Sequence, residues 1–389
     1  MKKSKSKNLL LQFKKVFNEV SKDINNNEKT ISILNKDFKF SRKLKELKKF
    51  KRFKTIALIG MGGSILGAEA INNFLENKIS KKVYFFNDLN ENKILDFKKR
   101  EKISNVLFII ISKSGNTIET LSNAFLLNVF KKNSKNVIII SERKNNLLFN
   151  ISKNFNLFHI AHNEYVGGRY SVLSEVGIIP AYLMGANIFK LRHKIRDCLS
   201  TKKRPSLRNN TIKMAKFIKS KKTNNLIFLN YAPELEKFLY WYQQLIAESL
   251  GKKNKGFLPV ISNVPKDHHS LLQLYLDGPR DKFFVIFTCK DKSINTINVK
   301  SEILKKNVFN KKKFSTIKSA QKNALIKAFK NKNIPFREFK IKKNNEETLG
   351  KLFAYFILET ILIGKLVNIN PFNQPAVEVV KKFTKQLLN

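Results

Sequence analysis

The chain has 389 residues, of which 42% are hydrophobic, so it can form two domains of ordinary size, each with a buried core. Nowhere do about 18 apolar residues run together as a membrane helix requires, and the basic start is broken by polar residues too early for a signal-peptide core. The two cysteines, Cys198 and Cys289, are far apart and offer neither a disulfide framework nor a metal site. We therefore expect a cytoplasmic protein with no membrane partner.

The charge is strongly positive, with 76 basic against 29 acidic residues and a net charge of +47 at pH 7. Such an excess ordinarily suggests nucleic acid or an anionic surface as a partner. The lysines, however, are spread along the whole chain among abundant Asn, Ile and Phe, without a basic tail or an Arg-rich arm. A general compositional bias explains this pattern better, so we expect no specific nucleic-acid partner. Salt-dependent, non-specific binding would still be unsurprising.

The first half of the chain predicts a helical segment followed by a parallel sheet. Residues 1–45 form the helical segment, because apolar residues recur at helical spacing between Asn8 and Val20. Strands are then predicted at 55–60, 83–86, 106–111, 137–140 and 156–160, with helices such as 65–75 and 118–130 between them. This alternation is typical of βαβ units, so residues 46–197 are predicted to be a doubly wound α/β domain with helices on both faces.

A polar stretch at 198–210 is predicted to be the linker to a second domain, over 211–389. Alternation resumes there, with strands at 225–229, 283–288 and 336–341 and helices at 211–220, 234–250, around 299–306, 315–331 and 346–366. A terminal helix then starts near Pro375. The predicted fold class is therefore two α/β domains, each a doubly wound, mostly parallel sheet, although we find no residue-level repeat.

The most informative stretch is VLFIIISKSGNTIET, at 106–120. A buried strand stops there at a polar loop that carries Ser112, Lys113, Ser114 and Thr117. Ligands of open parallel sheets bind at that edge, and unpaired N–H groups at the start of the next helix favour an anion such as phosphate. The alternative is a hydroxyl-rich turn that only caps the helix.

A second turn, GMGGSILG at 60–67, follows the first predicted strand and contains Gly63 and Ser64. Its glycines allow close approach of the backbone to a ligand. The G-x-G-x-x-G fingerprint of a dinucleotide site is matched only weakly, because the glycine spacing differs and the next acidic residue, Asp88, comes late.

Two further segments offer single side chains for chemistry. Arg169 follows two glycines, which can direct it inward or leave it on the surface at a helix start. Gln244 and Glu248 stand at i and i+4 and share a helix face beside an apolar stretch. Glu248 therefore suits a general base, with a solvated helix end as the alternative.

The remaining candidates are weaker when taken alone. His268 and His269 are the only adjacent pair among the five histidines and lie in a turn-like segment. Lys381 lies on the terminal helix, but a lysine carries little information in a chain so rich in lysine. No cluster of His, Asp, Glu and Cys has the spacing of metal ligands, so no metal and no cofactor are expected.

Taken together, six segments between residues 59 and 382 resemble, in order, the motifs of the glucose-6-phosphate isomerase family. The likeness is to its short bacterial form, built of two sugar-isomerase (SIS) domains. The segments are IGMGGSILGAEA, SKSGNTIETLSNA, VGGRYSVLSEVG, QQLIAESLGKKNKG, HHSLLQLYLDGPRDK and NPFNQPAVEVVKK. The VGGRYS and QQLIAESLGK segments are highly specific, whereas SKSGNTIET also resembles loops of SIS regulators and other isomerases.

The resemblance implies reversible conversion of glucose 6-phosphate to fructose 6-phosphate through an enediolate. By this likeness Glu248 is the general base, Arg169 stabilises the enediolate, and His269 and Lys381 assist ring opening. The residues implied to bind the hexose 6-phosphate are Gly63, Ser64, Ser112, Lys113, Ser114, Thr117 and Gln244. A homodimer is implied as well, because in this family the histidine reaches the active site across the subunit interface.

The loop at Ser112 departs from the bulkier, threonine-rich version of many family members, which leaves the choice of substrate open. One alternative is a related isomerase that also acts on mannose 6-phosphate. The other is a non-catalytic SIS regulator that binds a sugar phosphate. The joint presence of Glu248, Arg169, His269 and Lys381 argues against the regulator, which needs the phosphate loop but no base.

Overall fold

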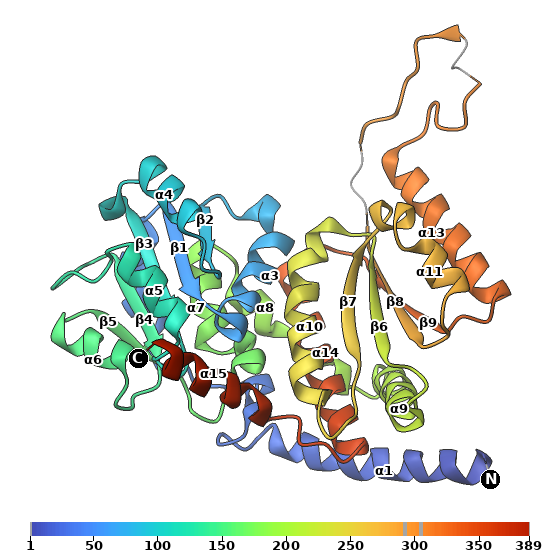
Figure 1. Ribbon diagram of the computed structural model, residues 1–389, viewed down its shortest axis with the longest axis horizontal. Helices are drawn as coiled ribbons and strands as arrows, with labels where there is room; N and C mark the ends of the chain where they lie inside the picture. The colour runs from blue at the N-terminus through green and yellow to red at the C-terminus, as the bar shows by residue number, and fades with distance from the viewer. Residues whose placement is uncertain (1, 291–293, 303–305, 389) are drawn as a thin grey trace.

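The computed structural model describes residues 2–290, 294–302 and 306–388, and it contains two parallel sheets, each flanked by helices (Figure 1). The first sheet has the order β2-β1-β3-β4-β5, and the second has the order β7-β6-β8-β9. All pairings within both sheets are parallel. The predicted fold class is therefore confirmed.

The first sheet consists of β1 (Thr55–Gly60), β2 (Lys82–Phe86), β3 (Val106–Ile111), β4 (Val137–Ser141) and β5 (Phe158–Ala161). Its helices are α3 (Leu66–Phe74), α4 (Glu91–Arg100), α5 (Ile118–Leu126), α6 (Leu147–Asn154), α7 (Glu175–Met184) and α8 (Ile188–His193). The strand β3 is buried along its whole length between β1 and β4, as its unbroken apolar run predicts. Its carboxyl end therefore opens at the point where the strand order reverses, between β1 and β3.

The second sheet consists of β6 (Asn225–Asn230), β7 (Leu258–Asn263), β8 (Lys282–Cys289) and β9 (Phe336–Ile341). The helices around it are α9 (Arg204–Ser220), α10 (Glu236–Leu250), α11 (Leu272–Asp277), α13 (Phe314–Asn331) and α14 (Glu346–Leu366). The edge strand β7 is absent from the predicted elements. The helix predicted over 299–306 includes residues 303–305, which lie outside the described part of the chain.

Several predicted boundaries are corrected by the local backbone. The strand predicted from Asn156 starts at Phe158, because Asn156 has a left-handed φ of 50° that ends the preceding turn. The helix predicted to reach Phe130 stops at Leu126 for the same reason, since Asn128 has a φ of 55°. The helix predicted from 211 begins at Arg204, inside the range predicted as a linker, with a proline in its first turn.

The apolar residues form three clusters rather than one core for each domain. One cluster lies under the outer face of the first sheet, where α4, α5 and α6 pack, and another under α11 and α13 on the second sheet. The largest cluster lies between the two sheets and joins Leu58 of the first to Phe228 of the second through α3, α7, α10 and α14. The two sheets therefore share a core.

Both ends of the chain run along this body. The helix α1 (Lys2–Asp23) packs on α14 and α9, and α2 (Leu44–Leu47) follows before β1. The terminal helix α15 (Pro375–Leu388), dark red in Figure 1, reaches from the end of α14 to the first domain. It buries none of its described residues. The long loop between α14 and α15 passes the carboxyl end of α10.

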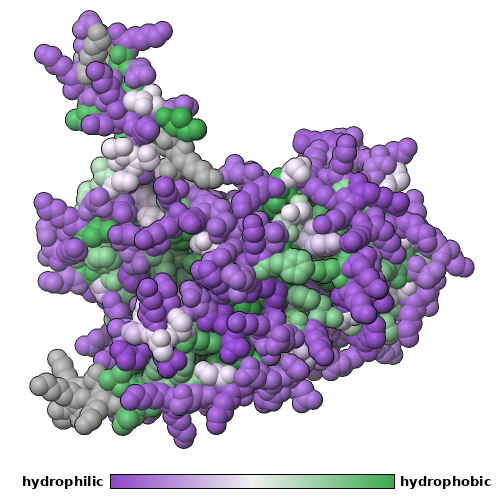
Figure 2. All heavy atoms as spheres, turned by 180° about the vertical axis from the view of Figure 1, so that it is seen from behind, coloured by the Kyte–Doolittle hydropathy of each residue, from purple (hydrophilic) through white to green (hydrophobic). Residues whose placement is uncertain are grey.

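Figure 2 shows hydrophilic residues spread over one whole face of the molecule, with smaller hydrophobic areas between them. No helix in the described residues is both long and apolar enough to cross a membrane.

Two histidines at the end of the first sheet are buried in the neutral form. Burial lowers the pKa of both His159 and His162 from 6.5 to about 4, and nearby cations act in the same direction. The His159 ring contacts the Ser141 hydroxyl at 3.0 Å, and Nδ1 of His162 donates to the Asn163 carbonyl at 2.9 Å. Their contribution to stability therefore depends on pH.

We predict that the free energy of unfolding falls as pH decreases from 6.5 toward 4, because the unfolded chain takes up protons that the folded protein excludes. At pH 5 the loss is about 2 kcal/mol for each histidine. Urea unfolding at pH 7 and pH 5 measures this loss. His162→Asn, whose amide replaces the Nδ1 donor, should lose less stability between these pH values than the parent; an equal loss would contradict the assignment.

Candidate active site

The loop after β3 is a tight turn held by its own hydroxyl groups. The hydroxyl of Ser112, which is buried, lies 2.8 Å from that of Thr117, and it accepts the N–H of Gly115 at 3.2 Å. Gly115 has a left-handed φ of 68°, and a Cβ there would overlap the amide oxygen of Asn146 at 1.7 Å. The turn thus requires glycine, and it ends at Thr117, the residue before α5.

The ammonium group of Lys113 is engaged away from this loop. It donates to the Glu164 carbonyl at 2.7 Å and lies 3.6 Å from the Glu142 carboxylate. Burial is the largest influence on its pKa, which is lowered, while Glu142 opposes the shift. The predicted role of Lys113 in phosphate binding therefore requires the side chain to leave these partners.

A cavity of about 550 Å³ separates this loop from α15. Ser114 and Thr117 line one wall and Lys381 lines the other, although these residues are far apart in sequence. Lys381 is exposed and forms an ion pair with Glu378 at 2.7 Å. The structure thus brings together the loop after β3 and Lys381, to which the family resemblance assigns phosphate binding and ring opening.

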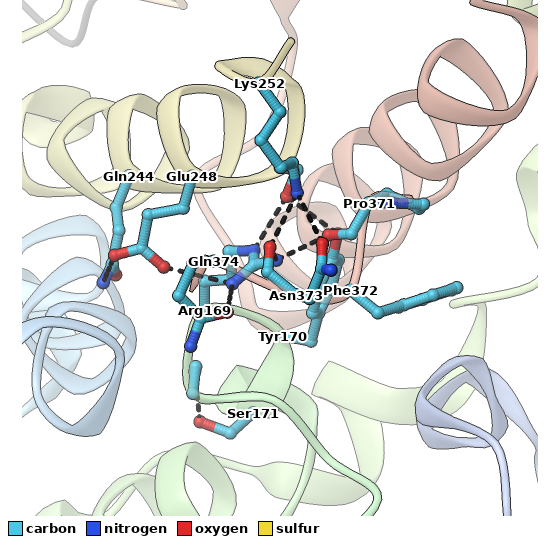
Figure 3. Close-up of polar contacts among 12 residues, drawn as sticks. Arg169, Tyr170, Ser171, Gln244, Glu248, Lys252, Pro371, Phe372, Asn373 and Gln374 are labelled. Atoms are coloured by element: carbon cyan, nitrogen blue, oxygen red, sulfur yellow. Dashed lines mark hydrogen bonds and ion pairs between the residues drawn. The ribbon is translucent and has the colours of Figure 1, made fainter. Parts of the chain in front are cut away.

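A second group of predicted residues meets around the guanidinium of Arg169, which is only 1% exposed (Figure 3). Its Nε donates to the Ser249 hydroxyl at 2.8 Å, and Nη1 donates to Glu248 at 3.1 Å and to Gln374 at 2.8 Å. Nη2 donates to the carbonyls of Pro371 at 2.5 Å and Asn373 at 3.2 Å. All five N–H donors of the guanidinium are therefore satisfied.

The backbone of Arg169 is fixed as firmly as its side chain. Trp241 on α10 donates its indole N–H to the Arg169 carbonyl at 3.1 Å. On the other side the 3₁₀ turn η3 (Gly62–Ser64) meets η6 (Gly168–Leu173), and a Cβ on Gly63 would lie 2.2 Å from the Gly168 carbonyl carbon. Gly63 is thus required for backbone contact beside the site, where the sequence predicts a residue close to the sugar phosphate.

Glu248 and Gln244 lie side by side on α10, as the i and i+4 spacing predicts. The Gln244 amide donates to one carboxylate oxygen of Glu248 at 2.9 Å, and Arg169 donates to the other. The Glu248 side chain remains 30% exposed and lines a cavity of about 870 Å³ between α10 and residues 369–377. The carboxylate is therefore oriented by two donors and still accessible. Ser64 lies in the turn η3, which begins at Gly62. This turn is close to Gln244, because a Cβ added to Gly62 would lie 2.8 Å from the Gln244 amide nitrogen.

His269 does not join either group within one chain. It lies at the end of η9 (Lys266–His269), which follows β7, and it is exposed. Its neighbour His268 contacts the Tyr231 hydroxyl at 3.0 Å. Among residues 2–290, 294–302 and 306–388, no group of three or more His, Cys, Asp and Glu side chains could hold a metal ion.

Sequence reasoning missed two side chains that complete the Arg169 cluster. Ser249 links the guanidinium to the Tyr170 hydroxyl at 2.8 Å, and it directly follows Glu248 in the chain. Gln374 belongs to the segment NPFNQPAVEVVKK, from which only Lys381 is selected. Gln374 could have been noticed because it directly precedes Pro375, the first residue of α15. A polar side chain at the start of a helix is free to point toward a neighbouring segment instead of along the helix.

We predict that Gly63→Ala destabilises the protein and disturbs Arg169, because the new Cβ would meet rigid backbone rather than a side chain that can turn away. Overpacking of this kind costs about 1–3 kcal/mol. Gly168→Ala is the matched control, because its Cβ would come no nearer than 3.9 Å to Gly63. Urea unfolding of both variants measures the difference; equal stabilities would show that the two turns are not in tight contact.

The chain is similar to known proteins over most of its length. The phosphoglucose isomerase family matches residues 18–389. The glucose-6-phosphate isomerase of Methanocaldococcus jannaschii is 33% identical over 91% of this chain and 89% of its own length, and that of Campylobacter jejuni is 31% identical over 86% and 85%.

Two solved structures share the fold. A hypothetical protein from Thermus thermophilus superimposes with a TM-score of 0.81 at 21% identity, covering 97% of this chain and 94% of its own. A glucose-6-phosphate isomerase from Chlamydia trachomatis gives a TM-score of 0.71 at 18% identity, covering 88% and 71%. The match over nearly the whole chain and the identity to curated relatives lead to one conclusion: this chain belongs to the phosphoglucose isomerase family.

Proposed function

We propose that this protein interconverts glucose 6-phosphate and fructose 6-phosphate by proton transfer between C2 and C1. The observation that carries the proposal is the Glu248 carboxylate, which two donors orient at an accessible cavity in a chain of this family. A single carboxylate suffices, because C1 and C2 are adjacent and the proton removed from one is returned to the other.

In this mechanism Arg169 interacts with two negative charges in turn. In the resting site its Nη1 donates to the Glu248 carboxylate and holds that carboxylate in place. When Glu248 takes the proton, its charge disappears and an enediolate charge arises beside the same guanidinium. The cation is already held in place by Ser249 and two carbonyls, so little reorganisation is needed at the moment of reaction.

We assign the phosphate group of the substrate to the cavity of about 550 Å³ between the loop after β3 and α15. Ser114 and Thr117 line this cavity and offer hydroxyl donors to a phosphate, and Lys381 lines it from α15. The buried Ser112 hydroxyl contacts that of Thr117, and we assign Ser112 and Ser64 to the same phosphate from the family pattern. Gly63 and Gln244 connect this loop region to the base, because η3 contacts both η6 and α10. We assign ring opening to Lys381 and His269, as in the family pattern.

The position of His269 favours a homodimer with shared active sites. Within one chain it lies beside β7, away from the Arg169 cluster, so a second subunit is needed to supply it. We therefore propose a cytoplasmic homodimer in which each site combines His269 of one subunit with Glu248 of the other. For the domains we propose the predicted limits of 46–197 and 211–389, joined through 198–210 and preceded by 1–45, with the change that the second domain includes the whole of α9 from Arg204.

Glu248→Gln tests the base. The amide keeps the shape but cannot accept the proton, so turnover should fall by about 10²- to 10⁴-fold while substrate is still bound. A coupled assay with fructose 6-phosphate, and in parallel with mannose 6-phosphate, measures turnover, and deuterium incorporation at C2 from D₂O reports the transfer itself.

The matched control is Glu347→Gln. The Glu347 carboxylate lies in the first turn of α14 and pairs with lysines rather than with Arg169. It should leave turnover unchanged. Wild-type protein that exchanges no proton with either sugar would overturn the isomerase proposal, and unimpaired Glu248→Gln would remove the assigned base.

Mixing two inactive variants tests the shared site. If each site takes His269 and Glu248 from different subunits, mixed dimers of His269→Ala and Glu248→Gln contain one site with both residues intact. Co-refolding equal amounts should give mixed dimers in about half of the population by random pairing and restore roughly a quarter of wild-type activity. No recovery in dimers that are shown by mass to be mixed would place both residues on one subunit.

A further inference from the structure

A lysine outside the predicted site holds the segment that completes it. Lys252 follows α10 in a tight turn that pairs its backbone with Lys255 in both directions, each at 3.1 Å. The two central residues, Lys253 and Asn254, have left-handed φ angles of 55° and 54°, which non-glycine residues adopt only when the surroundings require it. The turn therefore presents Lys252 from a fixed position.

The ammonium group of Lys252 is directed at residues 370–373. Its Nζ donates to the carbonyls of Asn370 and Asn373, both at 2.6 Å, and lies 3.4 Å from the Asn373 side-chain oxygen (Figure 3). The Asn373 carbonyl also accepts from Nη2 of Arg169. Two cations thus meet at one carbonyl, directly before Gln374 and the start of α15.

We propose that Lys252 is a positioning residue of the active site, which holds the 370–374 segment against Arg169 and so places Gln374 and the beginning of α15. The inference rests on the proposed isomerase function. Its physical basis is that Lys252 ties this segment to the end of α10 through two carbonyls, and the segment's carbonyls must stay aligned for the Arg169 guanidinium to keep its donors satisfied.

The charge around Lys252 gives the proposal a pH signature. Arg169 and Glu248 are the charged groups that act on it, and Lys253 and Lys255 line the same cavity. The pKa of Lys252 is lowered from 10.5 to about 8, chiefly by desolvation and also by the Arg169 charge, while the Glu248 charge opposes the shift. Its ammonium form, which is the stronger donor, is therefore present below about pH 8 and is lost as pH rises through that value.

The test compares Lys252→Met, Lys252→Arg and Lys253→Met, the last a lysine that lines the same cavity. Lys252→Met should lower kcat on the order of 10- to 100-fold through misplacement, with a much smaller change in KM. Lys252→Arg should retain most of kcat at pH 7 and keep it above pH 8, where the wild type declines. Lys253→Met should behave as the wild type.

Hydrogen exchange of residues 366–388, followed by mass spectrometry, gives a readout that does not need activity. Exchange should rise in Lys252→Met and not in the other two variants. If Lys252→Met keeps wild-type exchange in this segment, or wild-type kcat in an active enzyme, the positioning role is wrong. A wild type that is inactive on both hexose phosphates would contradict the proposed function instead, and the exchange comparison would still decide the role of Lys252. If Lys252→Met does not fold, Lys252→Arg still decides the question. A loss of kcat above pH 8 in Lys252→Arg that equals the loss in the wild type overturns the inference.

Discussion

The buried guanidinium of Arg169 is the interaction on which the site depends. An arginine that is 1% exposed keeps its charge in the interior, and an unpaired charge there would cost several kcal/mol. The cost is offset because α10 and the 370–374 segment both bring acceptors to the guanidinium that η6 carries. These segments are far apart in sequence, so satisfying one side chain fixes their relative positions. The base Glu248 is oriented by the same requirement.

This constraint also explains why glycines surround the site. The backbone of η6 can carry Arg169 inward only if η3 lies directly against it, and the Gly63–Gly168 contact leaves no room for a side chain on Gly63. Gly62, with a φ of 52°, turns η3 toward the Gln244 amide. Two weak signals in the sequence, a glycine turn and an arginine after two glycines, thus belong to one structural unit.

The sequence predicts the parts of the fold that depend on local patterns. Strand β3 matches its prediction residue for residue because a strand buried on both faces must be apolar throughout. Strand β7 escapes prediction because it is an edge strand, is partly exposed and contains Pro259. The early start of α9 escapes for a similar reason, since Arg204 and Pro205 read as loop residues although proline fits the first turn of a helix.

The site is predictable only where the residue type is rare in this chain or belongs to a motif. Glu248 stands out by its spacing from Gln244, and both Glu248 and Arg169 stand out by family resemblance; the structure brings these two side chains to 3.1 Å from each other. Lys252 gives no such signal, because lysines are found throughout this chain. Its proposed role also depends on two backbone carbonyls that lie more than a hundred positions further along the sequence. Carbonyl acceptors leave no trace in side-chain patterns, so contacts of this kind emerge only from the folded chain.

The core that lies between the two sheets limits how the active site opens. Separating the sheets would expose the apolar residues of α3, α7, α10 and α14 to water, which is strongly unfavourable. A hinge between the domains is therefore a poor route for hexose phosphate to enter. The terminal helix α15 buries none of its described residues, yet it forms one wall of the cavity at the phosphate loop. Displacement of α15 alone would open this cavity without exposing the core between the sheets.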